Sequence, residues 1–274
     1  MPTFTRNNKP VVGTLDLVVG NTLRLKLNGL GPGKKHYRIK SANACLEITQ
    51  NANDRQAEQT LAIKALRACE GVRVEAFSAV DDLPSGIHVV INVLEALQLP
   101  DGKTDEGCLA RLLLAESVVP PNAAGLEEAL YSMQLMRQVI ENRMAFSEPK
   151  HFGKPAGKTM TAFITAKDPL QFEGFGNYPA IGSKQVKVDG YVKLANDGSD
   201  LRFAFLRQHV QNALDVAAGR SVAKPYKPAL YAWMTAGNDP GGYFVKALDK
   251  GGQVFFSLQQ AFIDNPNNPG KPKK

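Results

Sequence analysis

Apolar and polar residues alternate along most of residues 10–95, a pattern typical of strands that bury one face and expose the other. The connections between the alternating runs contain Gly, Pro, Asn and Asp, which favour turns. The runs are LDLVV at 15–19, LRLKL at 23–27, YRIKS at 37–41, CLEIT at 45–49, TLAIKAL at 60–66, VRVEAF at 72–77 and IHVVINV at 87–93.

Seven short strands in fewer than ninety residues predict a small β-sandwich of the immunoglobulin-like type. The stretch GPGKK at 31–35 looks like a phosphate-binding loop, but it lacks the spacing and the following helix, and we interpret it as a hairpin turn. No catalytic constellation is evident in this half. By fold analogy alone, we expect this half of the chain to be a binding or docking module.

The hydrophobic period changes after about residue 100. Residues 107–116 predict an apolar helix interrupted only by Arg111, and a longer helix is predicted to follow, with Asn122 as its N-cap. Residues 146–200 are rich in loop formers, and residues 201–220 return to a helical pattern that Gly219 would end. The buried stripe of the longer helix is predicted to comprise Leu126, Leu130, Met133, Met136, Ile140 and Met144.

These patterns predict a multidomain α and β protein. We expect a β-sandwich docking or binding domain over residues 1–100 and a mainly α domain over residues 101–264. The last residues, 265–274, read NPNNPGKPKK and predict a disordered basic tail.

The chain of 274 residues has a net charge of +7 and a pI of about 9.2, which favours polyanionic partners. The positive charge is scattered and no nucleic-acid-binding motif occurs, so we expect no nucleic acid partner. No apolar run approaches the ~20 residues that span a bilayer, so we expect no membrane insertion. The start lacks an apolar signal core, which predicts synthesis as a cytoplasmic protein.

The cysteines and histidines do not have the spacing of a metal site, and we expect no metal and no cofactor. Cys45 and Cys69 both lie in strand-like segments and would be able to pair in an oxidising compartment. The alternative, which we favour at this point, is that these two and Cys108 are buried thiols.

Glu116 is the most informative residue, because it stands where the first apolar helix ends. A general acid for glycoside cleavage has to keep its proton near neutral pH, and apolar walls disfavour the charged form of a carboxyl group. The run LLLA before Glu116 and the segment Val118–Pro121 after it would supply such walls. The competing interpretation is a solvated helix end.

Cys108 offers a second candidate. It lies at a predicted helix start, where the dipole lowers a thiol pKa, and His151 or His209 would serve as its base. Asp105 and Glu106 directly before it would oppose a thiolate, so a structural thiol is the preferred interpretation.

Six stretches in order resemble the SleB-type cell wall hydrolases, a family similar to the lysozyme-like lytic transglycosylases. The resemblance spans about residues 105–260. The stretches are ARLLLAES at 110–117, QVIENRM at 138–144, DPLQFEGF at 168–175, NALDVAAGRSV at 212–222, PALYAWM at 228–234 and GGQVFFSL at 251–258.

The resemblance implies a lysozyme-like fold and cleavage of the MurNAc–GlcNAc β-1,4 bond of peptidoglycan, with Glu116 as the catalytic acid. It also implies that Gln171 and Phe172 line the cleft, and that Asn142 and Arg143 form a structural pair. The aromatic positions Tyr231 and Phe255 match positions that would stack on sugar rings.

The chain departs from the family pattern at two places. Ser117-Val118-Val119 follows Glu116 where the family often has Arg-Gly-Glu, and Gln253 stands where a His is common. The sequence therefore does not identify a second catalytic carboxylate beside Glu116. Of the four candidates, Glu173 is the best placed, beside the Gln-Phe pair; the others are Glu127, Glu128 and Asp168.

A wall enzyme without a signal sequence needs another route to its substrate. An antibacterial effector of the type VI secretion system, injected into the periplasm of a rival, fits this pattern. Secretion machinery and a cognate immunity protein would then be partners. Two other functions remain open: a Cys108-dependent peptidase or amidase, and a non-catalytic adaptor that binds peptidoglycan.

Overall fold

The computed structural model describes residues 2–29, 37–41, 43–53 and 58–272, so the predicted hairpin turn GPGKK lies outside the described residues. The chain divides into two compact units. The β-unit comprises Met1–Ala96 together with Asn196–Phe203, and the helical unit comprises Leu97–Ala195 together with Ala204–Lys274. The division along the chain falls at Ala96, close to the predicted boundary.

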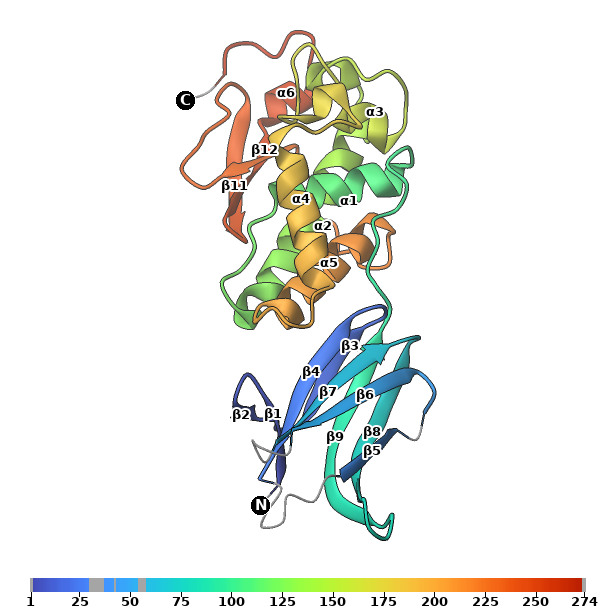
Figure 1. Cartoon of the computed structure of the whole chain (residues 1–274). Coiled ribbons are helices and arrows are strands. Elements are labelled where there is room, and N and C mark those ends of the chain that lie inside the picture. The colour runs from blue at the N-terminus through green and yellow to red at the C-terminus, as the bar shows by residue number, and fades with distance from the viewer. Residues whose placement is uncertain (1, 30–36, 42, 54–57, 273–274) are drawn as a thin grey trace. The chain divides into compact units, whose positions relative to one another are not determined.

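The strands of the β-unit form two sheets (Figure 1). The five-stranded sheet has the order β2-β1-β4-β7-β6 and the four-stranded sheet the order β3-β9-β8-β5, with β3 parallel to β9. The strands are β1 (Thr3–Arg6), β2 (Lys9–Pro10), β3 (Thr14–Val18), β4 (Thr22–Asn28), β5 (Tyr37–Ser41), β6 (Leu46–Asn53), β7 (Glu58–Ala65), β8 (Cys69–Ser78) and β9 (Pro84–Leu94).

The two sheets share one apolar core, because alternate residues of the longer strands point inward. In β4, for example, Leu23, Leu25 and Leu27 are buried while Arg24 is exposed. All seven predicted strands are confirmed. Leaving β2 and β3 aside, the strand order is that of the seven-stranded immunoglobulin sandwich. The order β1-β4-β7-β6 corresponds to its strands A, B, E and D, and β5-β8-β9 corresponds to its strands C, F and G.

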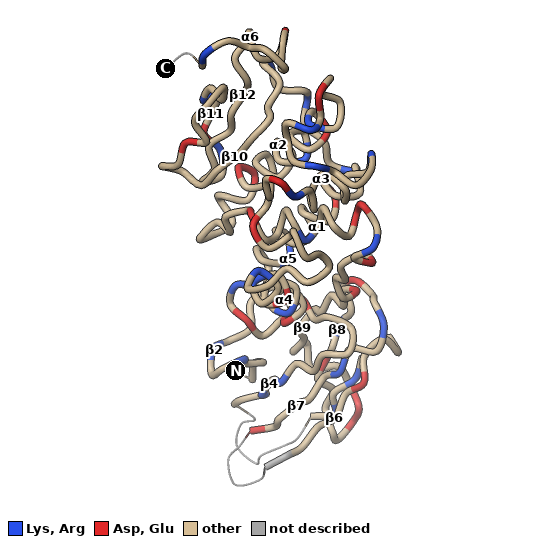
Figure 2. The backbone as a smooth tube through the Cα atoms, turned by 90° about the horizontal axis from the view of Figure 1, so that it is seen from above, with Lys and Arg blue, Asp and Glu red and all other residues tan. Residues whose placement is uncertain are grey.

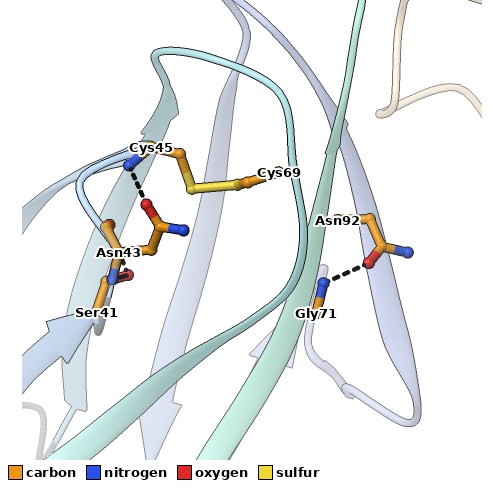
Figure 3. The surroundings of a disulfide bond; sticks show 6 residues. All are labelled: Ser41, Asn43, Cys45, Cys69, Gly71 and Asn92. Carbon is orange, nitrogen blue, oxygen red and sulfur yellow. Dashed lines mark hydrogen bonds between the residues drawn. A yellow bond between two sulfur atoms is a disulfide. The ribbon is translucent and has the colours of Figure 1, made fainter.

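Cys45 and Cys69 form a disulfide bond (Figure 3). Cys45 directly precedes β6 in one sheet and Cys69 begins β8 in the other, so the bond ties the two sheets together. The backbone N–H of Cys45 donates to Asn43 Oδ1 at 3.1 Å, which fixes the turn beside the bond. The favoured interpretation of Cys45 and Cys69 as free thiols was therefore wrong, and only Cys108 is a buried free thiol.

As far as the structure describes it, up to residue 272, the helical unit holds six helices, three short 3-10 turns and a three-stranded sheet in the order β10-β12-β11. Its elements are α1 (Asp105–Glu116), η1 (Ala123–Gly125), α2 (Leu126–Ala145), η2 (Pro149–Phe152), α3 (Met160–Ile164), η3 (Phe175–Asn177), α4 (Ser183–Ala195), α5 (Phe203–Ala217), β10 (Ala232–Thr235), β11 (Phe244–Lys250), β12 (Gln253–Leu258) and α6 (Gln260–Asp264).

Helix α1 is the centre of this unit and packs against α2, α3 and α4 (Figure 1). The Thr104 side chain caps its start by accepting from Gly107 N–H. The apolar side chains of α1 face the core of the unit, and its leucines have no exposed surface. Met133, Met136 and Ile140 of the predicted α2 stripe are fully buried, whereas Leu126, Leu130 and Met144 lie at its margin.

Three features depart from the sequence predictions. Strands β1 and β2 precede the first predicted strand, and α4 lies inside the region predicted as loops. Residues 265–272 are not a free tail, because Asn267 Nδ2 donates to Glu148 Oε1 at 3.1 Å and Tyr243 Oη donates to Gly270 O at 2.6 Å. These bonds attach the segment to the helical unit.

Candidate active site

Glu116 is the last residue of α1, so its backbone leaves the apolar core at this point. Ala115 is 5% exposed, and Ser117 after it is 1% exposed. The Glu116 side chain, in contrast, is 21% exposed. The end of α1 therefore places one partly exposed carboxylate directly after the buried run Leu112–Ala115.

The partly exposed carboxylate of Glu116 lines a cleft of about 520 Å³ within the helical unit. Its walls come from the end of α1, from the loop that carries Glu173, from α4, and from the sheet. The lining residues are Ala115, Glu116, Ser117, Val118, Val119, Glu173, Lys184, Lys187, Tyr191, Thr235 and Gln253. The cleft thus combines two carboxylates with two ammonium groups.

Two side chains hold the end of α1 by its free carbonyl groups. Lys187 Nζ donates to Ala115 O at 2.6 Å and to Ser117 O at 3.2 Å, and Gln253 Nε2 donates to Glu116 O at 2.8 Å. A cation at a helix C-terminus is favourable because the last carbonyls carry partial negative charge. Burial lowers the pKa of Lys187, and the negative charge of Glu116 acts in the opposite direction.

Lys184 forms an ion pair with the carboxylate of Glu116. The two side chains are 20% and 21% exposed, so the pair is partly shielded from water. Lys184 and Lys187 are three residues apart in α4 and lie on the same side of that helix. One lysine thus fixes the backbone at Glu116, and the other neutralises its side chain.

A buried polar pair lies beside the cleft. Ser117 Oγ and His209 Nε2 are 3.2 Å apart, and His209 is fully buried. Burial lowers the pKa of His209 to about 4, and the positive charge of Lys187 adds to this effect. His209 is therefore neutral near pH 7, and Ser117 is too buried to act as a nucleophile.

We predict that the stability of the helical unit falls between about pH 6.5 and pH 4 because of His209. Over this range the unfolded chain takes up a proton on His209 while the folded chain, with its lowered pKa, does not. The loss should approach ~3 kcal/mol. Urea denaturation of wild type and His209→Gln at a series of pH values measures it, and equal pH slopes for both chains would contradict it.

The predicted Gln-Phe pair lies next to a buried arginine rather than in the cleft lining. Arg143 Nη1 donates to Gln171 Oε1 at 3.1 Å, and the guanidinium lies 5.2 Å from the Phe152 ring centroid and 5.3 Å from that of Phe172. Phe172 is 7% exposed and stacks on Trp233. Gln171 and Phe172 therefore position the loop that carries Glu173, and the prediction that they line the cleft is corrected.

The two aromatic residues predicted to stack on sugars are core residues. Phe255 has no exposed surface, and Tyr231 is 8% exposed and stacks on Phe152 with ring centroids 5.7 Å apart. Both belong to strand or strand-edge positions whose rings point into the unit. A ring without exposed surface cannot cover a sugar, so this prediction is wrong.

Of the carboxylates considered as partners, only Glu173 lines the cleft with Glu116. Glu127 and Glu128 are exposed in the first turn of α2, and Asp168 pairs with Lys154 at 3.7 Å. Asn142 Nδ2 donates to Leu230 O at 2.9 Å, which fits the predicted structural role.

Cys108 does not have the surroundings of a nucleophile. The thiol is fully buried near the start of α1, and burial raises its pKa to about 12. The two histidines proposed as its base lie elsewhere: His209 contacts Ser117, and His151 packs edge-on against Phe262. A thiolate at Cys108 is therefore strongly disfavoured.

Charge, metal and membrane features add little to the site. Lysine and arginine positions are interspersed with acidic ones along the chain (Figure 2). Among the described residues, no group of three His, Cys, Asp or Glu side chains is arranged to hold a metal ion. Over the same described residues, no helix has the length and apolarity that crossing a membrane requires.

Comparisons with known proteins give no family for this chain. No family model matches it, and no curated protein matches it. Similar solved structures include the tandem Ig repeats of Dlar (11% identity, 37% of this chain and 50% of that chain, TM-score 0.23). Another is from the Titin M10–Obscurin like 1 Ig complex (19% identity, 35% of this chain and 97% of that chain, TM-score 0.23). At these scores the likeness adds nothing to the strand order described above.

The sequence predictions missed Lys184, Lys187 and His209 as neighbours of Glu116. The spacing of the two lysines by three residues in SKQVKVDG would place them on one helix face, but that signal requires α4 to be recognised as a helix. The buried position of His209 on α5 has no comparable sequence signal.

Proposed function

We propose that the helical unit is a lysozyme-like peptidoglycan glycosidase that cleaves the β-1,4 bond between MurNAc and GlcNAc. The observation that carries the proposal is the position of Glu116, partly exposed at the end of α1 and in one cleft with Glu173. Most glycosidases use two carboxyl groups that flank the scissile bond. The resemblance of residues 105–260 to SleB-type hydrolases supports the same assignment.

In the proposed mechanism the Glu116 carboxyl protonates the glycosidic oxygen while positive charge develops at C1 of the sugar. The resulting carboxylate then takes a proton from the attacking group, either a water or the C6 hydroxyl of the same sugar. Water gives a reducing end, and the C6 hydroxyl gives a 1,6-anhydro end.

The ion pair between Lys184 and Glu116 has to open during the proposed reaction. In the free protein the Glu116 carboxylate is held by Lys184, but in the acid step the same carboxyl group has to donate to the glycosidic oxygen. We therefore infer that a bound sugar separates Lys184 from Glu116. The long flexible side chain of Lys184 permits this movement without a change in α4.

We propose Glu173 as the second carboxylate, and predict that Glu173→Gln lowers the cleavage rate about 100-fold. Asp168→Asn is the matched control, because Asp168 belongs to the same loop region but pairs with Lys154 outside the cleft. Fragment release from purified peptidoglycan measures both. Full activity of Glu173→Gln with 1,6-anhydro products would exclude Glu173 and assign the C6 hydroxyl route.

We further propose that the protein acts outside the cytoplasm. Disulfide bonds persist in oxidising compartments such as the bacterial periplasm, and Cys45–Cys69 joins the two sheets of the β-unit. The net charge of +7 suits the acidic wall polymer. An injected antibacterial effector meets both conditions, and its cognate immunity protein would cover the Glu116 cleft.

We predict that bacteria lyse when the chain is directed to their periplasm and grow normally when it stays in the cytoplasm. Culture turbidity after induction measures the outcome, and Glu116→Gln directed to the same compartment is the control. Growth unaffected by the periplasmic wild-type chain, at a level of soluble protein equal to that of the control, would contradict the effector proposal.

A further inference from the structure

The outer face of the five-stranded sheet in the β-unit is hollowed. The hollow has a volume of about 440 Å³ and is lined by residues of β1, β4, β6 and β7. Sites for small ligands have volumes of ~300–1,000 Å³, so one ligand would fit. The proposed glycosidase does not use this surface, because the Glu116 cleft is formed within the helical unit.

The strand register explains the hollow. Ala62 on β7 pairs with Arg24 on β4 and with Thr49 on β6, so a methyl group lies between two longer side chains. The neighbouring residues Leu25 and Leu61 point the other way, into the sandwich core. The short side chain of Ala62 therefore forms the floor, and the flanking strands form the walls.

The next row of residues on the same face is polar as well. Thr60 pairs with Lys26 on β4 and with Asn51 on β6. Lys26 Nζ lies 3.3 Å from Glu58 Oε2, so its charge is already balanced. The free charge of the hollow is therefore that of Arg24.

The polar groups in this hollow are available to a ligand. Within the described part of the chain, no hydrogen bond or ion pair engages the side chains of Arg24, Thr49 or Asn51. The β1–β2 turn adds Asn7 and Asn8 to the lining. Both have positive φ, 52° and 62°, as a two-residue hairpin turn requires and asparagine tolerates.

We propose that this hollow binds a carboxylate-bearing oligosaccharide. The planar fork of Arg24 matches a carboxylate with two parallel hydrogen bonds. The hydroxyl of Thr49 and the amide groups of the asparagines donate to and accept from sugar hydroxyls and acetamido groups. A nucleic acid would require several free cations along its backbone, whereas the described residues that line the hollow offer only the guanidinium of Arg24 as a cation outside an ion pair.

An acidic peptide fits less well. Peptides commonly add a strand to a sheet edge or place apolar anchors in pockets. Here the hollow lies on a sheet face, where the backbone groups of β4 and β7 are paired within the sheet. Among the described residues of the lining, the only apolar side chain that faces the hollow is that of Ala62. Recognition has to use polar side chains, which suits a sugar.

The test uses the full chain carrying Glu116→Gln, so that cleavage does not consume a probe. Three probes are titrated by ¹H–¹⁵N NMR: the disaccharide GlcNAc–MurNAc with its free lactyl carboxylate, the neutral disaccharide of GlcNAc, and a tri-aspartate peptide. We expect GlcNAc–MurNAc to bind most tightly and to shift the amide signals of β4, β6 and β7.

Three substitutions complete the test. Arg24→Gln should weaken GlcNAc–MurNAc binding about tenfold, and Ala62→Leu should block it by filling the floor. Lys64→Gln, on the same face of β7 but outside the hollow, should leave it unchanged. The proposal would be overturned if the peptide bound more tightly than GlcNAc–MurNAc, or if the neutral disaccharide bound equally well. It would also be overturned if GlcNAc–MurNAc did not bind, or if its binding were unaffected by Arg24→Gln and Ala62→Leu. Because the probes report binding alone, a failed glycosidase assay does not affect this result.

Discussion

Glu116→Gln is expected to lower peptidoglycan cleavage about a thousandfold, because an amide cannot donate the proton that the leaving sugar oxygen requires. The substitution preserves the size of the side chain. It also preserves the backbone bond from Gln253 to Glu116 O and the two bonds from Lys187. The loss should therefore be chemical and not structural.

The stability of the variant is its first control. Loss of the partly exposed ion pair with Lys184 should change the free energy of unfolding by no more than ~1 kcal/mol. The second control is Glu127→Gln, which removes an exposed carboxylate from the first turn of α2 and should retain wild-type activity. A folded Glu116→Gln chain with activity close to wild type would remove Glu116 from the mechanism.

Arg143→Ala is expected to destabilise the helical unit by about 4 kcal/mol. Arg143 is 6% exposed and donates to Tyr231 O at 2.6 Å and to Gln171 Oε1 at 3.1 Å. Its removal leaves these two acceptors without a donor and opens a cavity between the rings of Phe152 and Phe172. Burial lowers the pKa of Arg143 to about 9, as expected for a charge held inside the unit.

The single tryptophan, Trp233, reports this unfolding because it stacks on Phe172 in the same region. The melting temperature followed by its fluorescence should fall by roughly 10 °C. Arg220→Ala is the matched control, since Arg220 is 60% exposed and pairs with Asp215 on the surface. A melting temperature of Arg143→Ala equal to that of the control would contradict the assigned role.

The sequence predicted the strands of the β-unit well because each buries one face, and period-two alternation reports that directly. Strands β1 and β2 were missed since they have four and two residues, too few to show a period. Helix α4 was missed because its outer positions include exposed apolar residues such as Val186, which is 78% exposed and blurs the helical pattern.

The candidate site was predictable only in part. Glu116 was singled out because it directly follows the apolar run LLLA, where the predicted helix ends. Tyr231 and Phe255 were misassigned because an aromatic residue in a strand has the same sequence pattern whether its ring faces a cleft or a core. The contacts of Lys184 and Lys187 with the end of α1 join residues about seventy positions apart, and periodicity carries no information at that distance.

The most direct test of the proposed glycosidase is mass spectrometry of the soluble fragments released from purified peptidoglycan by wild type and by Glu116→Gln. We predict disaccharide-peptides from wild type alone, with reducing or 1,6-anhydro termini that identify the attacking group. The proposed glycosidase would be contradicted if peptides were released without disaccharides, or if the protein bound the insoluble wall without any soluble product. Equal products from both chains would contradict the role of Glu116.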